Sequence, residues 1–495
     1  MSKKNQNYTN RKQNRFQPER MRGNVFVNNS GKQWLPGENG RAAKVERLLR
    51  GAKEEKKEIA GNMAGYKNSG VEWIGAIPEG WNVSKVKHET SFIGSGTTPR
   101  SGCLSFYENG TIPWIQSGDL YETSEVTDTK QKITAEALRS SSALKVYDKD
   151  FIAMAMYGSI GNIAISRIAA CVNQACCCLR PNSKNNLNYM YYFLKTSTDN
   201  FKSKAMGAVL QNISQEKIKK QDFLVPPLHE QQRIADFLDT KCDILDRTID
   251  AVSRQIEDLE KYKRALITKT VTKGICKKGE PERAMKDSGV EWIGEVPKEW
   301  SVKPFKALAG MKSSSEYTAR DIVDEGEGAI LLSPSNINDN KLNLSKRTYI
   351  SQKKYDKSTT KIQRGDLLFT KTASVGKCVI YDSDEPAMPN PQLVVLKNIK
   401  CLPKFLYYSM VSDVMQEPAK MYIYGSVIPT ISQLNLGRIK ISVPSPEEQQ
   451  QIADYLDEKC KNIDNRVQKR KQQLEWLKEY KKSLIFDYVT GKKRV

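Results

Sequence analysis

The chain is poor in histidine and has no cysteine pair of the metal-binding kind. Its 495 residues include only two histidines, His88 and His229. This leaves little room for histidine-based acid–base catalysis or for a zinc site. The ten cysteines are scattered, none forms a Cys-x-x-Cys pair, and three are contiguous at 176–178. Such spacing suits neither zinc nor a disulfide framework, so we expect buried thiols in a reducing, cytoplasmic protein.

The sequence also lacks long apolar runs and the common catalytic motifs. No stretch is apolar enough to cross a bilayer, and no apolar signal region opens the chain. There is no Gly-x-Ser-x-Gly motif, no dinucleotide fingerprint, no amino-methyltransferase tetrapeptide and no carboxylate cluster with metal-ligand spacing. Residues 372–377 resemble a phosphate loop but have Lys371 for its first glycine and Cys378 for its Ser/Thr. We therefore predict a binding protein without a catalytic or metal site.

What the chain has in excess is positive charge. The formal net charge is +22 and the isoelectric point is about 9.3, whereas the hydrophobic content of 39% is ordinary for a globular protein. A balance this basic indicates a polyanionic partner. Because no membrane segment is expected, nucleic acid is favoured over an anionic membrane.

Two frames repeat along the chain with about the same offset. Residues 69–75 read Ser-Gly-Val-Glu-Trp-Ile-Gly and return letter for letter at 288–294, an offset of 219. Residues 230–239 read Glu-Gln-Gln-Arg-Ile-Ala-Asp-Phe-Leu-Asp and return as Glu-Gln-Gln-Gln-Ile-Ala-Asp-Tyr-Leu-Asp at 448–457, an offset of 218. The stretches between these frames differ strongly. Two like frames with two unlike inserts predict two different surfaces in equivalent positions.

Each insert has the pattern of a mixed domain. Short β-branched and aromatic runs alternate with Gly, Pro, Asn and Ser turns, and one helical stretch stands near 187–198 and again at 403–415. Residues 1–62 are polar and basic, and we expect a disordered arm there. Met63 stands just before the first repeat, so a chain that began there would keep the whole repeat.

A long helical segment follows each insert. In the first, apolar residues from Leu245 to Leu266 step by 4, 3, 4, 3 and 7, the a/d seam of a coiled coil. The second seam is its duplicate, interrupted by Arg470. Ser445, Pro446 and Glu448 predict the start of the second helix with a capping box. Two seams of equal length should pair with each other, antiparallel, as a rod of 35 residues or roughly 50 Å.

The repeated residues resemble the specificity subunits of type I restriction–modification systems. The frame at 69–75 followed by Pro78 and Trp81, with its copy before Trp300, carries the resemblance together with the Glu-Gln-Gln-x-Ile-Ala-Asp helix start. It covers residues 66–490. The fold it implies is α+β, with two mixed α/β target recognition domains separated by a pair of long antiparallel coiled-coil helices in a pseudo-two-fold internal repeat. The expected boundaries are 66–222, 223–275, 285–440 and 441–490.

The resemblance also implies partners. Each recognition domain would read one half of a bipartite double-stranded DNA site, and the helices would dock two methyltransferase subunits. Restriction subunits would join that complex. No cofactor is expected on this chain, because S-adenosylmethionine, ATP and magnesium would belong to the partner subunits.

The family's recognition loops match two places in each copy. Glycine there allows close approach to phosphate, and Gln, Asn, Ser and Lys supply paired donors and acceptors. Ordinary turn chemistry is the competing explanation for each residue, and for Arg100 a solvated turn is an equal alternative. The candidate DNA-binding residues are Arg100, Gln116, Ser117, Asp119, Tyr157, Ser159, Asn162, Ser333, Ser335, Asn336, Lys371, Thr372, Ser374 and Lys377.

Two other functions remain open at this point. One is an enzyme such as a nuclease fused to a coiled coil, which the missing motifs disfavour. The other is a coiled-coil interaction protein with incidental basic charge, whose behaviour on DNA would not depend on salt. The Lys-rich helix faces fit a solvated surface as well as contact with DNA or an acidic partner.

Overall fold

The computed structural model describes residues 65–157, 160–203, 212–275, 279, 283–314 and 317–495. Within the predicted arm at 1–62 it describes only the paired strands β1 (Phe26–Val27) and β2 (Gln33–Trp34), so the expected disorder of the rest lies outside the described residues. The chain divides into two compact units, residues 1–237 with 484–495, and residues 238–483. Among the described residues, no helix is apolar over a length that would cross a membrane.

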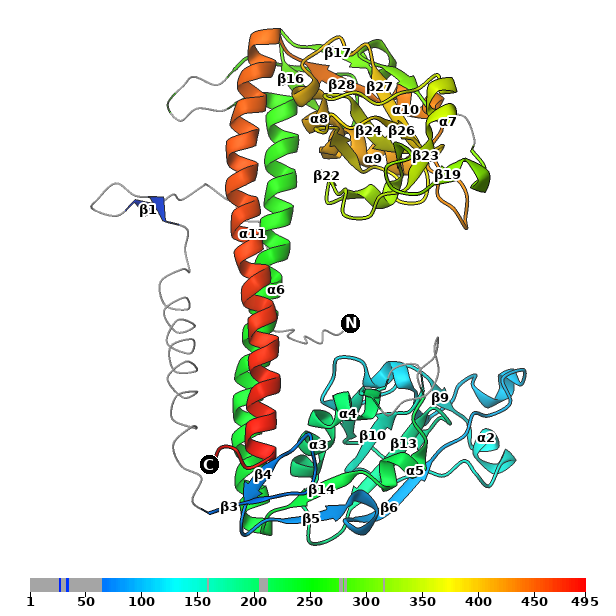
Figure 1. Ribbon diagram of the computed structural model, residues 1–495, viewed down its shortest axis with the longest axis vertical. Helices are drawn as coiled ribbons and strands as arrows, with labels where there is room; N and C mark the ends of the chain where they lie inside the picture. Colours follow the sequence, from blue (N-terminus) through cyan, green and yellow to red (C-terminus); the bar gives the residue numbers. More distant parts are fainter. Residues whose placement is uncertain are drawn as a thin grey trace, which may run out of the picture. The chain divides into compact units, whose positions relative to one another are not determined.

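The first unit is built on two small sheets with helices packed beside them (Figure 1). One sheet has the order β6 (Thr90–Ser95), β13 (Cys176–Pro181), β10 (Phe151–Ala155), β11 (Ile163–Ser166) and β8 (Glu125–Val126). The other has the order β12 (Cys171–Val172), β7 (Ile112–Ile115) and β9 (Lys132–Ile133). The helices are α2 (Ala135–Ser140), α3 (Leu187–Thr196), α4 (Thr198–Ser203) and α5 (Gln215–Lys219). The mixed strand-and-turn pattern expected here is confirmed.

The second unit repeats this plan with the matching strands in place. One sheet has the order β18 (Gly310–Lys312), β27 (Leu393–Lys397), β24 (Leu367–Thr370) and β25 (Cys378–Ile380). The other has the order β19 (Ile322–Val323), β23 (Tyr349–Ser351), β20 (Gly328–Leu332) and β26 (Ala387–Pro389), and β21 (Ile337–Asn338) pairs with β22 (Lys341–Leu342). The helices are α7 (Gln352–Lys357), α8 (Pro403–Val411), α9 (Asp413–Met421) and α10 (Gln433–Arg438).

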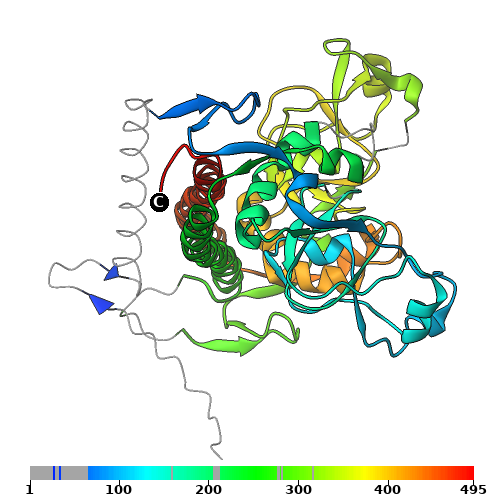
Figure 2. The same ribbon diagram turned by 90° about the horizontal axis from the view of Figure 1, so that it is seen from below.

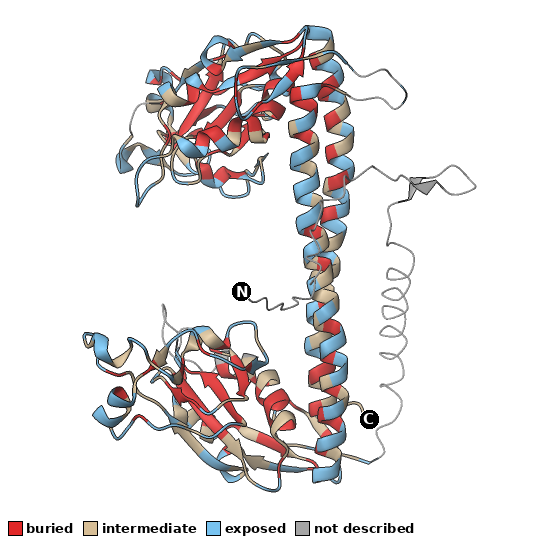
Figure 3. Ribbon diagram, turned by 180° about the vertical axis from the view of Figure 1, so that it is seen from behind, coloured by how far each residue is buried: buried red, intermediate tan, exposed pale blue. Residues whose placement is uncertain are grey.

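The contiguous cysteines lie in the core of the first unit. Cys176, Cys177 and Cys178 form the start of β13 and are fully buried, and Figure 3 shows the central strands of both units as buried. Burial is the main cause that raises the pKa of the Cys176 thiol and of the Cys178 thiol to about 12. These thiols are therefore protonated and unreactive at neutral pH. Seven of the nine described cysteines are buried as expected, whereas Cys103 and Cys401 are half-buried.

A two-stranded ladder closes the base of each insert. In the first unit β5 (Asn82–Lys85) pairs with β14 (Asp222–Val225), and Val86 N–H donates to the Gln221 carbonyl at 3.0 Å. In the second unit β17 (Ser301–Pro304) pairs with β28 (Lys440–Val443). The chain thus enters and leaves each insert through neighbouring strands. Because these strands extend the inserts, the long helices begin later than the expected 223 and 441.

The repeated sequences meet each other just outside this ladder. Trp81, in the first frame, donates its indole N–H to the Glu230 carboxylate at 3.0 Å, and Trp300 donates to Glu448 at 2.8 Å. Both tryptophans are 1% exposed. The strand pairs β3 (Tyr66–Asn68) with β4 (Ala76–Pro78), and β15 (Met285–Asp287) with β16 (Glu295–Pro297), lead into them. Both indole rings are therefore part of the core where each insert meets its long helix.

The glutamine that follows each of these glutamates is also buried, and its side-chain amide connects the long helix to the insert. Gln231 accepts the Asn186 N–H at the start of α3 at 2.9 Å and donates to the Pro226 carbonyl at 2.9 Å. Gln449 makes the same pair of contacts with Leu402 and Pro444, at 2.8 and 3.0 Å. The Glu-Gln-Gln repeat therefore attaches each long helix to its unit, which explains why both copies retain it.

The long helices are α6 (Leu228–Lys273) and α11 (Pro446–Val489), with 46 and 44 residues. At about 1.5 Å per residue, α6 is about 69 Å long, so the predicted 35-residue rod of roughly 50 Å was too short. Near its end, α6 contributes Ile267 and Val271 to a core cluster that also holds Trp300. The Ser445 hydroxyl caps the Glu448 N–H at 3.3 Å, but the expected return contact is not made because the Glu448 carboxylate bonds Trp300 instead.

The seams of α6 and α11 face each other in antiparallel orientation. Within the second unit, Lys263 pairs with Asp464 at 2.7 Å and Lys481 pairs with Asp246 at 2.5 Å. Each residue of the second pair is the duplicate, 218 positions away, of a residue in the first. The pairing thus has internal two-fold symmetry, and Figure 2 shows the two helices side by side, viewed nearly along their length. Arg470 interrupts the seam as predicted and is held by Gln473 at 2.7 Å.

We expect these symmetric ion pairs to determine the register of the helix pair. Asp246→Lys places two ammonium groups together and should lower the stability of the helical part by about 1 kcal/mol, because the pairs are partly exposed. Adding Lys481→Asp should restore most of that loss. A double-mutant cycle by urea unfolding measures the coupling. The exposed pair Lys482–Glu479, within one helix, is the control, and equal effects of the two reversals would contradict the prediction.

Candidate nucleic-acid interface

The candidate loops of each unit leave the sheets at one edge. In the second unit the carboxyl end of β24 lies beside the amino ends of β25 and β27, because both neighbours are antiparallel to it. The parallel strands β20 and β26 end at a common edge as well. The Lys377 ammonium donates to the Ile337 carbonyl at 3.1 Å and so connects the segments that follow β24 and β20. The structure therefore brings the two predicted loops of this unit together.

The first predicted loop is built in the same way in both units. At Gln116, the backbone N–H donates to the Asp119 carboxylate at 2.9 Å, and at Ser333 the backbone N–H donates to the Asn336 side chain at 3.0 Å. Asn336 is buried and also donates to the Lys346 carbonyl at 2.9 Å. Asp119 and Asn336 thus shape their loops from within. Of their neighbours, Ser335 is exposed and Ser117 is half-buried.

The second predicted loop has an equally close match between units. Ala155 N–H donates to the Asn162 carbonyl and Thr370 N–H to the Lys377 carbonyl, both at 2.9 Å. Tyr157 forms a β-bridge with Asn212, and Thr372 forms one with Thr430. Tyr157 is exposed, Ser374 is half-buried, and Ser159 lies outside the described residues. The shared register supports the predicted correspondence of the two loops.

Lys371 is held inside the edge of the second unit. Its ammonium contacts the Ser313 hydroxyl at 3.2 Å, and the same hydroxyl accepts the Gln433 amide at 2.6 Å. Burial lowers the pKa of the Lys371 ammonium. Its backbone N–H also donates to the Gln392 carbonyl at 2.9 Å. Lys371 therefore connects its own loop to the segments that carry Ser313 and Gln392.

A third segment at this edge was missed by the sequence reasoning. Asn173 N–H donates to the Ile115 carbonyl at 2.9 Å, and Asn390 N–H donates to the Leu332 carbonyl at 2.8 Å. Each asparagine side chain then accepts an N–H two residues later, in an Asx turn. The turns lie between the two predicted loops of their own unit. The signal was an asparagine recurring 217 residues apart in otherwise different surroundings.

Arg100 ends a short segment that aromatic side chains hold in place. The Trp114 indole N–H donates to the Thr97 carbonyl at 3.3 Å, and the Tyr107 hydroxyl donates to the Pro99 carbonyl at 2.7 Å. Arg100 itself is exposed at the end of this segment. Because these hydrogen bonds fix the backbone just before Arg100, the exposed guanidinium group is free to bind a phosphate or a guanine.

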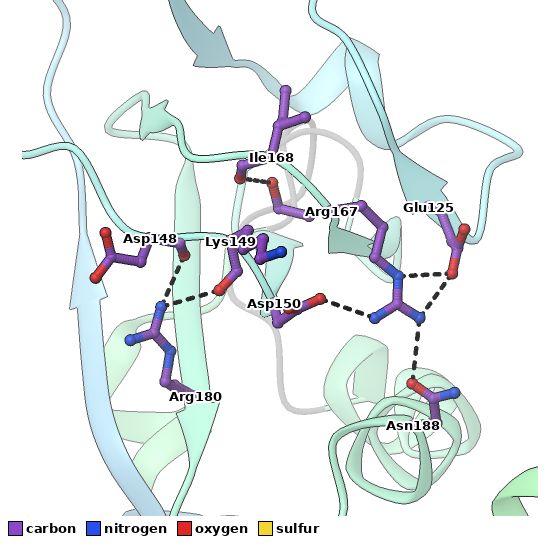
Figure 4. Close-up of polar contacts among 9 residues, drawn as sticks. Glu125, Asp148, Lys149, Asp150, Arg167, Ile168, Arg180 and Asn188 are labelled. Atoms are coloured by element: carbon purple, nitrogen blue, oxygen red, sulfur yellow. Dashed lines mark hydrogen bonds and ion pairs between the residues drawn. The ribbon is translucent and has the colours of Figure 1, made fainter.

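At the other ends of the strands, in the sheet of the first unit that contains β10, two arginines are already paired with carboxylates or hydrogen-bonded to carbonyl groups. Arg167 contacts Glu125 at 2.7 Å, Asp150 at 3.0 Å and Asn188 at 3.4 Å (Figure 4). Arg180 donates to the carbonyl of Asp148 at 2.7 Å, as Figure 4 also shows. These cations hold local structure and offer little to a polyanion. The loop edge is therefore the better candidate for contact with nucleic acid.

The chain was compared with known proteins. The family described as type I restriction modification DNA specificity domain matches residues 78–261 and again 297–476. Among curated relatives, the MjaVIII specificity subunit of Methanocaldococcus jannaschii is 26% identical over 62% of this chain and 70% of the relative. The putative MjaX specificity subunit of the same organism is 28% identical over 85% of this chain and 96% of the relative.

A solved structure with the same fold is similar to this chain. It comes from a study of complex assembly and conformational transition of the type I R-M system, and it aligns with a TM-score of 0.64 at 15% identity, over 84% of this chain and 99% of that chain. The two family matches include both inserts and most of both long helices. With two domain matches, two repeated frames and paired helices, the chain belongs to the type I restriction modification DNA specificity family.

Proposed function

We propose that this chain is the sequence-specific DNA-recognition subunit of a type I restriction–modification complex. The observation that supports this most strongly is the pair of equivalent loop edges. Both units have the same backbone register at Asn162 and Lys377, yet they present different side chains there. Such an arrangement suits the reading of two different half-sites. The relatives give no support to a nuclease or to an interaction protein without a role on DNA.

The long helices have two roles in this proposal. Major-groove half-sites on one face of B-DNA recur about every 34–36 Å, and a helix of 46 residues, about 69 Å, is long enough to set such a gap. The exposed faces of the helices would dock two modification subunits, and restriction subunits would join that complex. Catalysis would reside in these partners, which would carry S-adenosylmethionine, ATP and magnesium. This chain would supply recognition alone.

Methylation mapping tests the proposal. Deletion of this chain in its host should abolish methylation of a bipartite adenine motif with a fixed gap, because the modification subunits would lose their DNA-reading component. Re-expression of the chain should restore the same motif. Single-molecule sequencing of genomic DNA measures both. A methylation pattern that does not change on deletion would overturn the proposal.

A further inference from the structure

A short hairpin with an apolar tip projects from the loop edge of the second unit. Tyr424 N–H donates to the Thr430 carbonyl at 2.9 Å, and Thr430 N–H donates back to the Tyr424 carbonyl at 2.8 Å. Gly425 has φ +92°, and a Cβ there would lie 2.5 Å from the Ile428 carbonyl oxygen. Only glycine fits this position, so the turn has a defined shape. The tip is consequently presented by a pre-formed backbone.

This hairpin is joined directly to the predicted DNA-binding loop at 371–377. Ala373 N–H donates to the Pro429 carbonyl at 2.9 Å, and Ile431 N–H donates to the Lys371 carbonyl at 2.9 Å. These two contacts lie on either side of the hairpin's closing residue. The tip at 425–429 therefore lies beside the loop at 371–377, so a partner bound by that loop would also come close to the tip.

The tip exposes side chains that water solvates poorly. Val427 is 90% exposed and Ile428 is 57% exposed, and Tyr424 at the closing pair is exposed as well. The side chains of Val427 and Ile428 have no hydrogen-bond donor or acceptor, so neither side chain can read a base edge in that way. Clustered exposed apolar groups beside a basic surface indicate burial against a partner. In DNA, the apolar surfaces available are the base-pair faces and the thymine methyl groups.

Part of the tip sequence recurs in the first insert. Gly207, Val209 and Ile213 match Gly425, Val427 and Ile431 at an offset of 218, although residues 207–211 lie outside the described residues. The two units differ in the loops that would read bases. A tip sequence common to both inserts therefore suits a feature that both half-sites share, such as the stacking of base pairs, rather than the identity of one base.

We propose that Val427 and Ile428 form an apolar wedge that presses between stacked base pairs of the bound duplex. This rests on the proposed function. Contact with DNA is favoured over docking of a protein subunit because the hairpin is continuous with the loop edge. Lys312 supports this choice. It is exposed and stands next to Ser313, whose hydroxyl contacts Lys371, so its ammonium group could bind a phosphate beside the hairpin. The wedge separates two stacked base pairs, and the polar loops at 333–336 and 371–377 then contact the edges of the neighbouring bases.

The test uses the full complex with its modification subunits and a duplex carrying its own methylated motif. 2-Aminopurine is placed at each step of the half-site assigned to the second unit. We expect its emission to rise on binding of the wild-type complex at one step, because the base is unstacked there. The double variant Val427→Ser/Ile428→Ser should lose that rise and bind about tenfold more weakly. Ile322→Ser, an exposed apolar residue at the far end of the β20 sheet, is the control and should behave as wild type.

The outcomes separate the wedge from the proposed function. A wild-type complex that does not prefer its motif duplex over a scrambled one would overturn the proposed function itself. A complex that binds selectively but gives no emission rise, or gives one that the double variant keeps, would overturn the wedge alone. Loss of the modification subunits from the double variant would also overturn it, since the tip would then dock protein.

Discussion

Exchange of residues 86–221 for the corresponding segment of another family member is expected to change one half of the methylated motif and nothing else. The β5–β14 ladder closes the base of this insert and would remain native, as would Trp81, Glu230 and both long helices. The reading loops lie wholly inside the exchanged segment. The new half-site should therefore be that of the donor, while the gap and the other half-site stay as they were. Genome-wide methylation mapping measures all three.

The second unit provides the matched experiment. Exchange of residues 305–439, which lie inside the β17–β28 ladder, should change the other half of the motif and leave the first half unchanged. Together the two exchanges assign each half-site to a unit. If either exchange altered both halves, or altered the gap, the units would not read DNA independently and the modular interpretation would fail.

Replacement of Trp300 by alanine is expected to cause a large loss of stability in the second unit. The side chain is 1% exposed and donates to Glu448 at the start of α11. Removing a buried tryptophan costs about 3–5 kcal/mol through lost burial and the cavity left behind. Trp300→Phe keeps a six-membered aromatic ring but loses the pyrrole part of the indole and its N–H donor, so it should cost about 1–3 kcal/mol, less than alanine. Urea unfolding followed by circular dichroism measures both losses.

Trp292→Ala is the control for this effect. Trp292 stands in the repeated frame before Trp300 but is 37% exposed, so its removal should cost much less. Trp81→Ala should reproduce the effect of Trp300→Ala in the first unit, because Trp81 makes the equivalent bond to Glu230. Equal losses for Trp292→Ala and Trp300→Ala would contradict the view that the buried tryptophan holds the helix to the unit.

Much of the fold could be predicted from periodicity and repetition. The a/d spacing from Leu245 onward predicts a helix whose buried side faces an equal partner, and Val252, Ile256 and Val467 are buried as expected. The length was underestimated because a seam marks only the part of a helix that faces its partner. The first turns of α6 and α11 are held by hydrogen bonds from Trp81 and Trp300 instead. Such bonds between distant residues leave no periodic pattern in the sequence.

The candidate site was predictable in part. The resemblance to the specificity subunits located both loops and their correspondence between the units, and turn-forming residues at strand ends agree with it. The roles within each loop did not follow, because glutamine, asparagine and aspartate serve turns and base edges equally well. Asn336 is directed inward to carbonyl groups, whereas Ser335 is left outside. Only the neighbours in space distinguish the two cases.

The sequence by itself determined that there are two equivalent frames, that the long helices pair, and that the inserts differ, since repeats and spacing are properties of the chain alone. Tertiary structure decided which segments meet at the loop edge. Residues 313, 371 and 433 are far apart in the chain, yet the Lys371 ammonium and the Gln433 amide share one hydroxyl, that of Ser313. Such contacts depend on strand order, because strands that neighbour each other in a sheet bring the distant segments that follow them together.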